Sequence, residues 1–249
     1  MAVTKKQLLA FAILILAGIA YPKDTPLFSD EILKKHNIVD VQSLDPTIGV
    51  NLVYATEDNF LGRNVYGELK RCYLRREAAD MLVRAQLLLK KKRPGYSLLV
   101  FDGLRPRRIQ QLMWDIVRGT DQQQYVTNPK FGSMHNYGAA VDLTIADETG
   151  KPLDMGTPYD HFGPKAQPRY ENIFLHPGLL KKSGLGRAIR KQIEDEIKKY
   201  GPLTPSEVEN RLLLRNVMEQ AGFQSLMNEW WHFNAFPNHE ARKKFAIVE

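Results

Sequence analysis

The pattern of apolar residues predicts three β-strands along the chain. The first lies within residues 47–56, where the side chains at every second position from Ile48 to Tyr54 fall on one side. A second, buried strand is predicted within residues 96–103, and a third within residues 139–145.

Apolar residues at helical spacing predict two helices, and capping signals predict a third. Residues 74–89 show this spacing and lead into "KKKRPG", where cations suit a helix C-terminus and Pro-Gly ends the helix. A second helix is expected over residues 109–117. The sequence "TPSE" (204–207) has the form of a capping box with proline in the first helical position, so we expect a helix from there to about Gln220.

Residues 177–201 are basic and helix-prone but show no apolar alternation. We interpret them as a helical insertion at the surface. The mixture of strands and intervening helices, without an internal repeat, predicts one α+β domain over residues 21–249. The expected architecture is a small antiparallel sheet flanked by helices.

The N-terminal residues 1–20 have the layout of a secretory signal peptide. Lys5 and Lys6 precede an uncharged apolar run of about 14 residues, and small residues stand just before Tyr21 where a signal peptidase cleaves. The run is shorter than the roughly 20 residues of a membrane-spanning helix. We therefore expect export to the periplasm or cell envelope without stable membrane insertion, and a retained membrane anchor is the alternative.

The composition is that of an ordinary globular protein with a modest basic excess. The 249 residues include 35 Lys and Arg against 28 Asp and Glu, for a formal charge of +7. The basic residues are scattered and no nucleic-acid-binding module is recognisable, so we expect a solvated basic surface and no nucleic-acid partner. Cys72 is the only cysteine, which excludes an intramolecular disulfide and any metal site built from several thiolates.

The stretch "GSMHNYGAAVDLTI" (132–145) places a histidine and an aspartate before and within the third predicted strand. The apolar side chains of that strand share one face, which leaves Asp142 on the opposite face, pointing into a cleft. A Gly-containing turn would bring the imidazole of His135 close to it. One histidine and one aspartate are two of the three protein ligands of a typical catalytic zinc site.

The stretch "NEWWHF" (228–233) offers a third ligand, His232, and a second carboxylate, Glu229. A glutamate beside a zinc-bound water can act as general base and return the proton to the leaving amine. Residues three apart point to opposite faces of a regular strand, so a bulge, a bend or a helical turn is needed here. Taken separately, the two stretches are more typical of a hydrogen-bonded His–Asp pair and of an aromatic core segment.

Together, the two stretches match a family pattern. "SMHNYGAAVDLT" fits S-x-H-x-x-G-x-A-x-D and "EWWH" fits E-x-W-H, the zinc-site motifs of the D-alanyl-D-alanine dipeptidases, relatives of the zinc D,D-carboxypeptidases. "FDGLRPRR" resembles the D-G-x-R-P motif of this family, and "YATEDNFLGRNVYG", "MGTPYDHF" and "NRLLLRNVMEQAGF" resemble further segments. The resemblance covers about residues 45–164 and 204–236 in the order of the family.

The resemblance implies a metal site and two catalytic residues. His135, Asp142 and His232 would hold one zinc ion per chain, and Glu229 would be the general base. Arg105, in the D-G-x-R-P motif, would contact the scissile carbonyl oxygen and the oxyanion that develops from it. The zinc site would lie at the sheet.

The resemblance also implies a set of substrate contacts. Ser133, Asp160 and Tyr54 match positions that bind a small substrate, and Asp160 would pair with the free ammonium group and so reject longer chains. Two structural interpretations remain open beside these roles. Arg105 could form an ion pair with Asp102, and Asp160 could cap a loop.

The implied function is that of an exported zinc metallopeptidase. It would hydrolyse the dipeptide D-Ala-D-Ala to two D-alanines by attack of a zinc-bound water assisted by Glu229. One alternative is a zinc D,D- or L,D-carboxypeptidase that acts on peptidoglycan stem peptides, and another is a non-catalytic, zinc-stabilised binding module. Leu104 and Glu68 stand where some relatives carry tyrosine, near the expected pocket, which bears on the substrate rather than on the metal chemistry.

Overall fold

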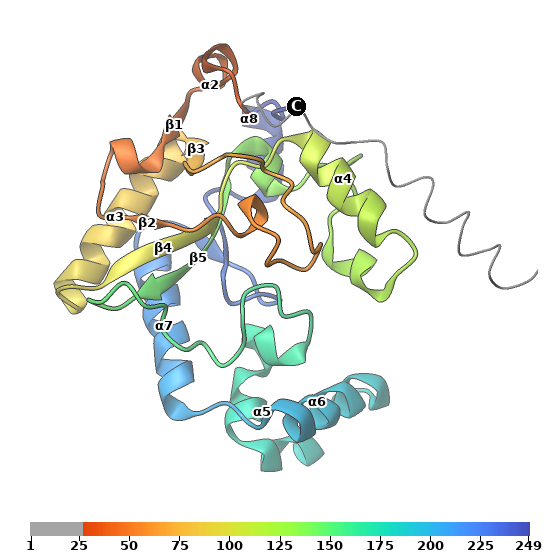
Figure 1. The fold of residues 1–249 in the computed structure, drawn as a ribbon. Coiled ribbons are helices and arrows are strands. Elements are labelled where there is room, and N and C mark those ends of the chain that lie inside the picture. The colour runs from red at the N-terminus through yellow and green to blue at the C-terminus, as the bar shows by residue number, and fades with distance from the viewer. Residues whose placement is uncertain (1–26) are drawn as a thin grey trace, which may run out of the picture.

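The computed structural model describes residues 27–249, which form a single α+β domain with a sheet at its centre (Figure 1). The predicted signal peptide, residues 1–20, lies outside the described residues. Within residues 27–249, no helix is both long enough and apolar enough to cross a membrane.

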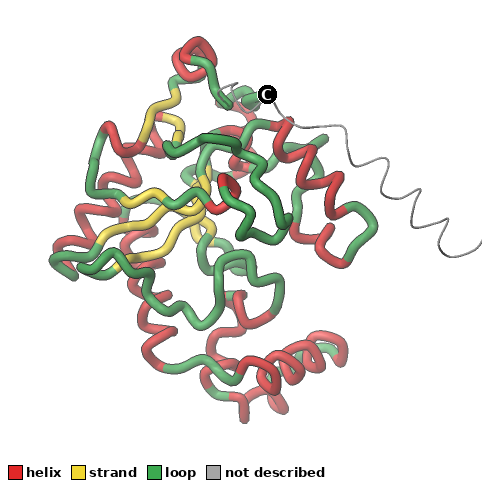
Figure 2. Tube along the Cα trace, in the orientation of Figure 1, coloured by secondary structure: helices red, strands yellow, loops and turns green. Residues whose placement is uncertain are grey.

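Helices and short strands alternate along the chain (Figure 2). The helices are α2 (Asp30–Lys35), α3 (Arg76–Lys92), α4 (Arg107–Val117), α5 (Glu171–Leu175), α6 (Arg187–Tyr200), α7 (Pro205–Gln220) and α8 (Asn238–Lys244). The strands are β1 (Ile38–Asp40), β2 (Gly49–Val50), β3 (Tyr73–Arg75), β4 (Ser97–Asp102), β5 (Ala140–Ala146), β6 (Gln224–Ser225) and β7 (His232–Asn234). Helices α3 and α4 and strands β4 and β5 confirm the predictions from the apolar pattern, and α7 confirms the prediction from the capping signals.

The main sheet has five strands in the order β2-β4-β5-β7-β6. Strand β5 pairs antiparallel with β4 and with β7, and β6 pairs antiparallel with β7. Strand β2, however, runs parallel to β4, so the sheet is mixed and not purely antiparallel as predicted. The reason is the crossover between them: α3 returns the chain to its starting edge, which gives a parallel pair.

The predicted strand within residues 47–56 is correct only at its start. Only Gly49 and Val50 pair with β4, and the chain then turns into a 3-10 helix at Val53–Ala55. Ile48, Leu52 and Tyr54 are nevertheless all buried. The alternation therefore reports which side chains are buried, while the backbone carbonyl of Tyr54 accepts hydrogen bonds from the following loop instead of from a strand.

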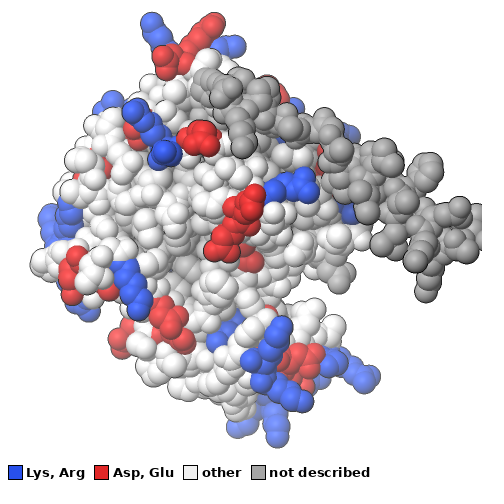
Figure 3. Space-filling view, in the orientation of Figure 1, with Lys and Arg blue, Asp and Glu red and all other residues white. Residues whose placement is uncertain are grey.

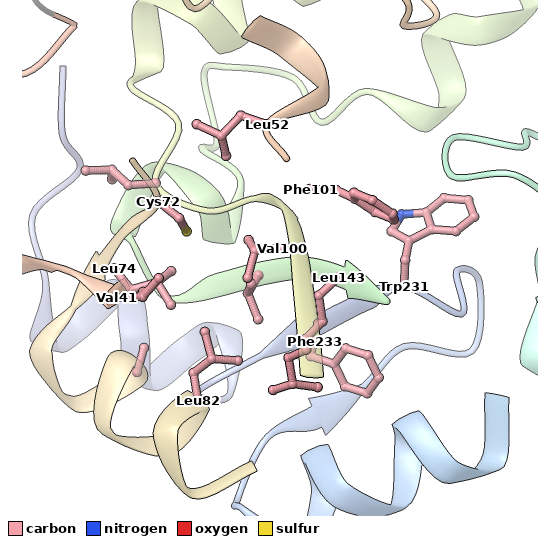
Figure 4. Close-up of a cluster of buried hydrophobic side chains, with 14 of the residues drawn as sticks. Val41, Leu52, Cys72, Leu74, Leu82, Val100, Phe101, Leu143, Trp231 and Phe233 are labelled. Atoms are coloured by element: carbon pink, nitrogen blue, oxygen red, sulfur yellow. The ribbon is translucent and has the colours of Figure 1, made fainter. Parts of the chain in front are cut away.

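One face of the sheet packs against α3 and α7. Figure 4 shows Val100 of β4, Leu143 of β5 and Phe233 of β7 in one cluster with Leu82 of α3, and all four are buried. Because successive residues of a strand point to opposite faces, this packing directs Asp142 of β5 to the other face. The hydrophobic layer thus fixes the side of the sheet on which polar residues can gather.

Helix α7 begins as its sequence predicts. The Thr204 hydroxyl accepts a hydrogen bond from the backbone N–H of Glu207 at 3.3 Å, and the Glu207 carboxylate accepts one from the Thr204 N–H at 2.6 Å. Pro205 occupies the first helical position. This capping box satisfies N–H groups that would otherwise lack a partner at the helix end.

The segment 177–201 is helical, and its apolar residues recur at helical spacing and not in the alternation of a strand. Ile189, Ile193 and Ile197 of α6 recur every four residues and pack in a small separate cluster with residues such as Phe174 and Leu203. Helices α5 and α6 occupy one end of the molecule, where Lys and Arg side chains project into solvent (Figures 1 and 3). The basic residues of α6 are thus its solvated face.

We expect the substitution Leu143→Ala to destabilise the fold by about 2–5 kcal/mol, because it leaves a cavity in the packed face of the sheet. Urea unfolding followed by circular dichroism measures this change. Leu87→Ala is the matched control, since Leu87 is 51% exposed and its truncation leaves no buried cavity. Equal losses in the two variants would contradict the assignment of the core.

Candidate active site

A cavity of about 570 Å³ lies on the polar side of the sheet. This volume is in the range of small-molecule sites. All eight residues predicted from the sequence line it: Tyr54, Arg105, Ser133, His135, Asp142, Asp160, Glu229 and His232. The structure therefore brings the predicted site together, while the roles of these residues remain predictions.

Three of these residues form a compact buried set that could hold a metal ion. His135 Nε2 lies 3.2 Å from His232 Nδ1 and 3.4 Å from Asp142 Oδ1, and His232 Nδ1 lies 2.9 Å from Asp142 Oδ1. Four-coordinate zinc with bonds of about 2.0–2.1 Å separates neighbouring ligand atoms by about 3.3–3.4 Å. The triangle of donor atoms thus fits one face of a zinc tetrahedron with little movement.

His135 reaches Asp142 because a short 3-10 helix, η4 (Met134–Tyr137), turns the chain before β5. The Ser133 hydroxyl accepts a hydrogen bond from the His135 N–H at 3.2 Å, and the Asn136 side chain accepts one from the Ser133 N–H at 2.7 Å. Gly138 ends η4 with φ +66, a backbone conformation that glycine adopts without steric cost. This glycine is the predicted turn between histidine and strand.

Neighbouring groups satisfy the other polar atom of each candidate ligand. His135 Nδ1–H donates to the Gly103 carbonyl at 2.8 Å, and His232 Nε2–H donates to Asn234 Oδ1 at 2.8 Å. These bonds select the tautomers in which His135 Nε2 and His232 Nδ1 are free to bind a metal. The Tyr159 hydroxyl donates to Asp142 Oδ2 at 2.9 Å, which leaves Oδ1 for the metal.

The sequence interpretation missed these supporting residues. Asn234 could have been found, because it lies two residues after His232 and so shares its strand face. Tyr159 and the Gly103 carbonyl come from segments far from their partners in sequence. No periodicity signals such contacts.

The electrostatics of the set favour a bound cation. Although burial opposes a charge on His232, the Asp142 carboxylate raises the pKa of this imidazole to about 9. Burial would raise the pKa of Asp142, but the two imidazoles lower it well below the ordinary value for aspartate. A metal ion would replace the proton shared by these groups, so metal affinity should fall on acidification.

Glu229 faces the candidate metal site through a bend in the chain. The bend at Trp230 and Trp231, rather than a helical turn or bulge, places Glu229 Oε2 4.0 Å from His232 Nδ1. Trp231 is buried and the Trp230 indole N–H donates to the Thr157 hydroxyl at 2.9 Å, so the bend is fixed. Burial raises the pKa of the Glu229 carboxyl, which brings it closer to the value of an effective general base.

Arg105 lines the cavity and also forms the ion pair with Asp102 that the sequence left open. Its Nε donates to Asp102 Oδ2 at 3.1 Å, its Nη2 contacts the same oxygen, and its Nη1 donates to Gln110 Oε1 at 2.9 Å. Asp102 is fully buried and also accepts a hydrogen bond from the Tyr66 hydroxyl at 2.6 Å. These contacts hold the guanidinium in one orientation, as electrostatic stabilisation of an oxyanion requires.

Asp160 lies in the cavity wall, and its carboxylate does not cap its own loop in any contact of the described residues. The Tyr54 hydroxyl donates to Asp160 Oδ2 at 2.9 Å. Burial raises the pKa of Asp160 well above the ordinary value, and the nearby Asp142 carboxylate raises it further. A ligand ammonium group would offset the free-energy cost of ionising this carboxyl. Ser133, in contrast, already uses its hydroxyl to cap η4.

The two departures from the family motifs do not line the cavity. Leu104 is buried in the core, and Glu68 is exposed at the surface. Leu104 nevertheless stands next to Arg105, which lines the cavity, so the bearing of these departures on the substrate stays a prediction.

A buried His–Asp–His set that could hold a metal ion, beside a carboxylate and a fixed guanidinium in one cavity, is typical of metal-dependent hydrolases. The profile of the D-ala-D-ala dipeptidase family matches residues 34–174 and 196–247, so the chain belongs to this family of peptidases. The match omits residues 175–195, which contain the first part of α6.

Curated relatives carry the same name as the family. D-alanyl-D-alanine dipeptidase of Escherichia coli K12 is 29% identical over 196 residues, which are 79% of this chain and 83% of the relative. The enzyme of that name from Synechocystis is 29% identical over 71% of this chain and 72% of its own length. The one from Enterococcus faecalis is 28% identical over 78% and 90%, respectively.

Asp160→Asn is expected to stabilise the protein at pH 8, by on the order of 1 kcal/mol. A carboxyl with a higher pKa in the folded than in the unfolded state destabilises the fold increasingly as pH rises from the unfolded to the folded pKa. Asparagine removes this effect and tolerates the positive φ of +57 at this position. Urea unfolding at pH 8 and below about pH 4 should show the difference only at the higher pH.

The exposed residue Asp58 provides the control, and Asp58→Asn should leave stability unchanged at both pH values. A less stable Asp160→Asn variant at pH 8 would contradict the assigned electrostatics.

Proposed function

We propose that the protein is a zinc-dependent dipeptidase that hydrolyses D-Ala-D-Ala to two D-alanines. The observation that carries this proposal is the triangle of His135 Nε2, Asp142 Oδ1 and His232 Nδ1, whose edges of 2.9–3.4 Å suit tetrahedral zinc. Hydrogen bonds to the second polar atom of each residue leave one donor atom per residue free to face a metal ion, which supports the same proposal. The names of the relatives support the substrate.

A bound zinc ion would lower the pKa of a water molecule and polarise the scissile carbonyl. Glu229 would remove the proton of the attacking water and deliver it to the leaving amine. Its raised pKa suits both transfers, because the protonated carboxyl forms readily and is still acidic enough to protonate an amine. Arg105 would donate hydrogen bonds to the developing oxyanion, from an orientation that Asp102 has already set.

Asp160 supports a substrate with a free amino terminus. Its carboxylate shares the cavity with the metal ligands and has one hydrogen-bond donor, the Tyr54 hydroxyl. A buried carboxylate of raised pKa gains most from a cationic partner. An acylated amino group of a stem peptide would offer no charge there, so the dipeptidase fits better than a carboxypeptidase.

A non-catalytic, zinc-stabilised module fits this arrangement less well. Metal binding alone requires neither Glu229 beside the donor atoms nor the network that orients Arg105. Both features are costly, because each holds charged groups away from water. A catalytic role would explain why both Glu229 and the network around Arg105 are present.

We also propose that the protein acts outside the cytoplasm, in the periplasm or cell envelope. The positive, apolar and small-residue regions of residues 1–20 support export. In that compartment the enzyme would act on dipeptide derived from cell-wall material. N-terminal sequencing of the protein from the exported fraction tests this, with Tyr21 as the expected first residue.

Glu229→Gln should lower kcat by at least about a hundredfold and leave zinc bound at one ion per chain, because the amide cannot accept the proton. Release of D-alanine from D-Ala-D-Ala, measured beside the zinc content, tests this. His135→Ala should lose zinc and turnover together, and a chelator should reproduce that loss in the unmodified protein. Glu68→Gln, at an exposed position outside the cavity, is the control and should behave as the unmodified protein.

Near-normal turnover of Glu229→Gln would refute the assigned base.

Free D-Ala-D-Ala should have a kcat/KM at least about a hundredfold above that of N-acetyl-D-Ala-D-Ala, because acylation leaves the buried polar site without its cation. In Asp160→Asn this preference should shrink through a rise in KM for the free dipeptide. A preference of the unmodified protein for the acylated peptide would favour the carboxypeptidase instead.

A further inference from the structure

One face of α6 touches the segment that carries Asp160. Gln192, Glu196 and Tyr200 recur every four residues and so lie in a row along the helix, beside the row of isoleucines that anchors it. Gln192 lines the cavity. Glu196 and Tyr200 contact residues that follow Asp160 in the chain.

Glu196 binds that segment through both of its carboxylate oxygens. His161 Nε2–H donates to Oε1 at 2.8 Å, and the backbone N–H of Lys165 donates to Oε2 at 2.6 Å. The side chains of His161 and Glu196 are only 14% and 15% exposed, so solvent weakens these bonds little. The Tyr200 ring packs edge-on against the imidazole, with centroids 5.3 Å apart.

Gly163 permits this close contact. A Cβ atom at this position would lie 1.8 Å from Glu196 Oε1, and any other residue would therefore push the carboxylate away. The glycine has an extended backbone, so its role here is space and not an unusual φ. The segment and α6 are thus shaped to fit each other.

The backbone of Asp160 needs such support. Its φ of +57 is uncommon for a residue other than glycine and is kept only where neighbouring contacts impose it. Tyr54 holds the carboxylate on one side. On the other side, Phe162 stacks on Tyr125 with centroids 4.6 Å apart, and Glu196 holds the intervening His161.

We infer that Glu196 and His161 are positioning residues, through which α6 holds Asp160 in place for a substrate with a free ammonium group. This inference rests on the proposed dipeptidase function for its substrate. The family profile leaves the first part of α6, including Gln192, unmatched, whereas Glu196 and His161 lie within the matched ranges. This arrangement separates selection of the substrate from the metal chemistry, which lies on the sheet.

Glu196→Ala tests the inference against Glu194→Ala, a matched change at an exposed position of the same helix. Glu196→Ala should raise KM for D-Ala-D-Ala by about tenfold, the effect of losing a hydrogen bond to a charged group, with kcat and zinc content close to normal. The preference for free over N-acetylated dipeptide should fall by a similar factor. Glu196→Gln, which keeps one acceptor oxygen, should recover part of the loss, and Glu194→Ala should change nothing.

If Glu196 acts through His161, the two sites must be coupled. His161→Ala should raise KM to a similar extent, and the double variant with Glu196→Ala should be little worse than either single change. Strictly additive losses, or a fall in kcat with unchanged KM, would overturn the inference.

Hydrogen–deuterium exchange gives a readout that does not depend on the substrate. Amides of residues 160–165 should exchange faster in Glu196→Ala than in Glu194→Ala, while those of β5 should not change. Unchanged exchange in residues 160–165 would overturn the positioning role. If the unmodified protein failed to cleave D-Ala-D-Ala, the proposed function would fall, and the exchange result would still decide whether α6 holds this segment.

Discussion

The register of three neighbouring strands is the constraint on which the site depends. Asp142 of β5 lies directly opposite His232 of β7 and pairs on its other side with Asp102 of β4, after an irregularity in the β4–β5 ladder. Asp142 and His232, two of the candidate metal ligands, therefore lie side by side across the sheet with Asp102, the carboxylate that orients Arg105. A slip of one residue in β5 would turn Asp142 into the hydrophobic layer and expose Leu143, so the core packing enforces the site geometry.

This geometry also places several carboxylates away from water. Burial destabilises their ionised form unless a cation lies nearby. Asp102 forms an ion pair with Arg105, and Asp142 contacts His232, whose imidazole pKa rises in response. Asp160 forms no ion pair among residues 27–249, and burial raises its pKa although the charge of Arg105 acts in the opposite direction. In the proposed reaction, these three carboxylates would face three cations: Asp102 the fixed arginine, Asp142 the metal and Asp160 the substrate ammonium.

Much of this arrangement could be predicted from the sequence, because the signals were local or repeated. Helical spacing in residues 74–89, the capping box at Thr204 and the alternation in β5 each follow from backbone geometry. The grouping of His135, Asp142 and His232 was predictable because two short motifs resemble those of a known family, while their role as metal ligands stays a prediction. The parallel placement of β2 was not, since apolar alternation says nothing of a strand's neighbour or direction.

The supporting contacts were beyond prediction for a different reason. Tyr159, which binds Asp142, and Glu196, which binds His161, are joined to their partners only by the folded chain. The isoleucine row of α6 was present in the sequence but was hidden by the charged residues between its members.

That row explains how α6 can contact the site while it stays independent of the main core. The cluster around Ile193 gives α6 a small core of its own, distinct from the layer beneath the sheet. The helix then meets the cavity wall through a few polar contacts, chiefly those of Glu196. Changes on this face can alter how Asp160 is held while the strand register, and with it the metal geometry, stays the same. If Asp160 selects the substrate as proposed, contacts on this face would act on substrate choice, whereas the core packing constrains the geometry of the candidate metal ligands.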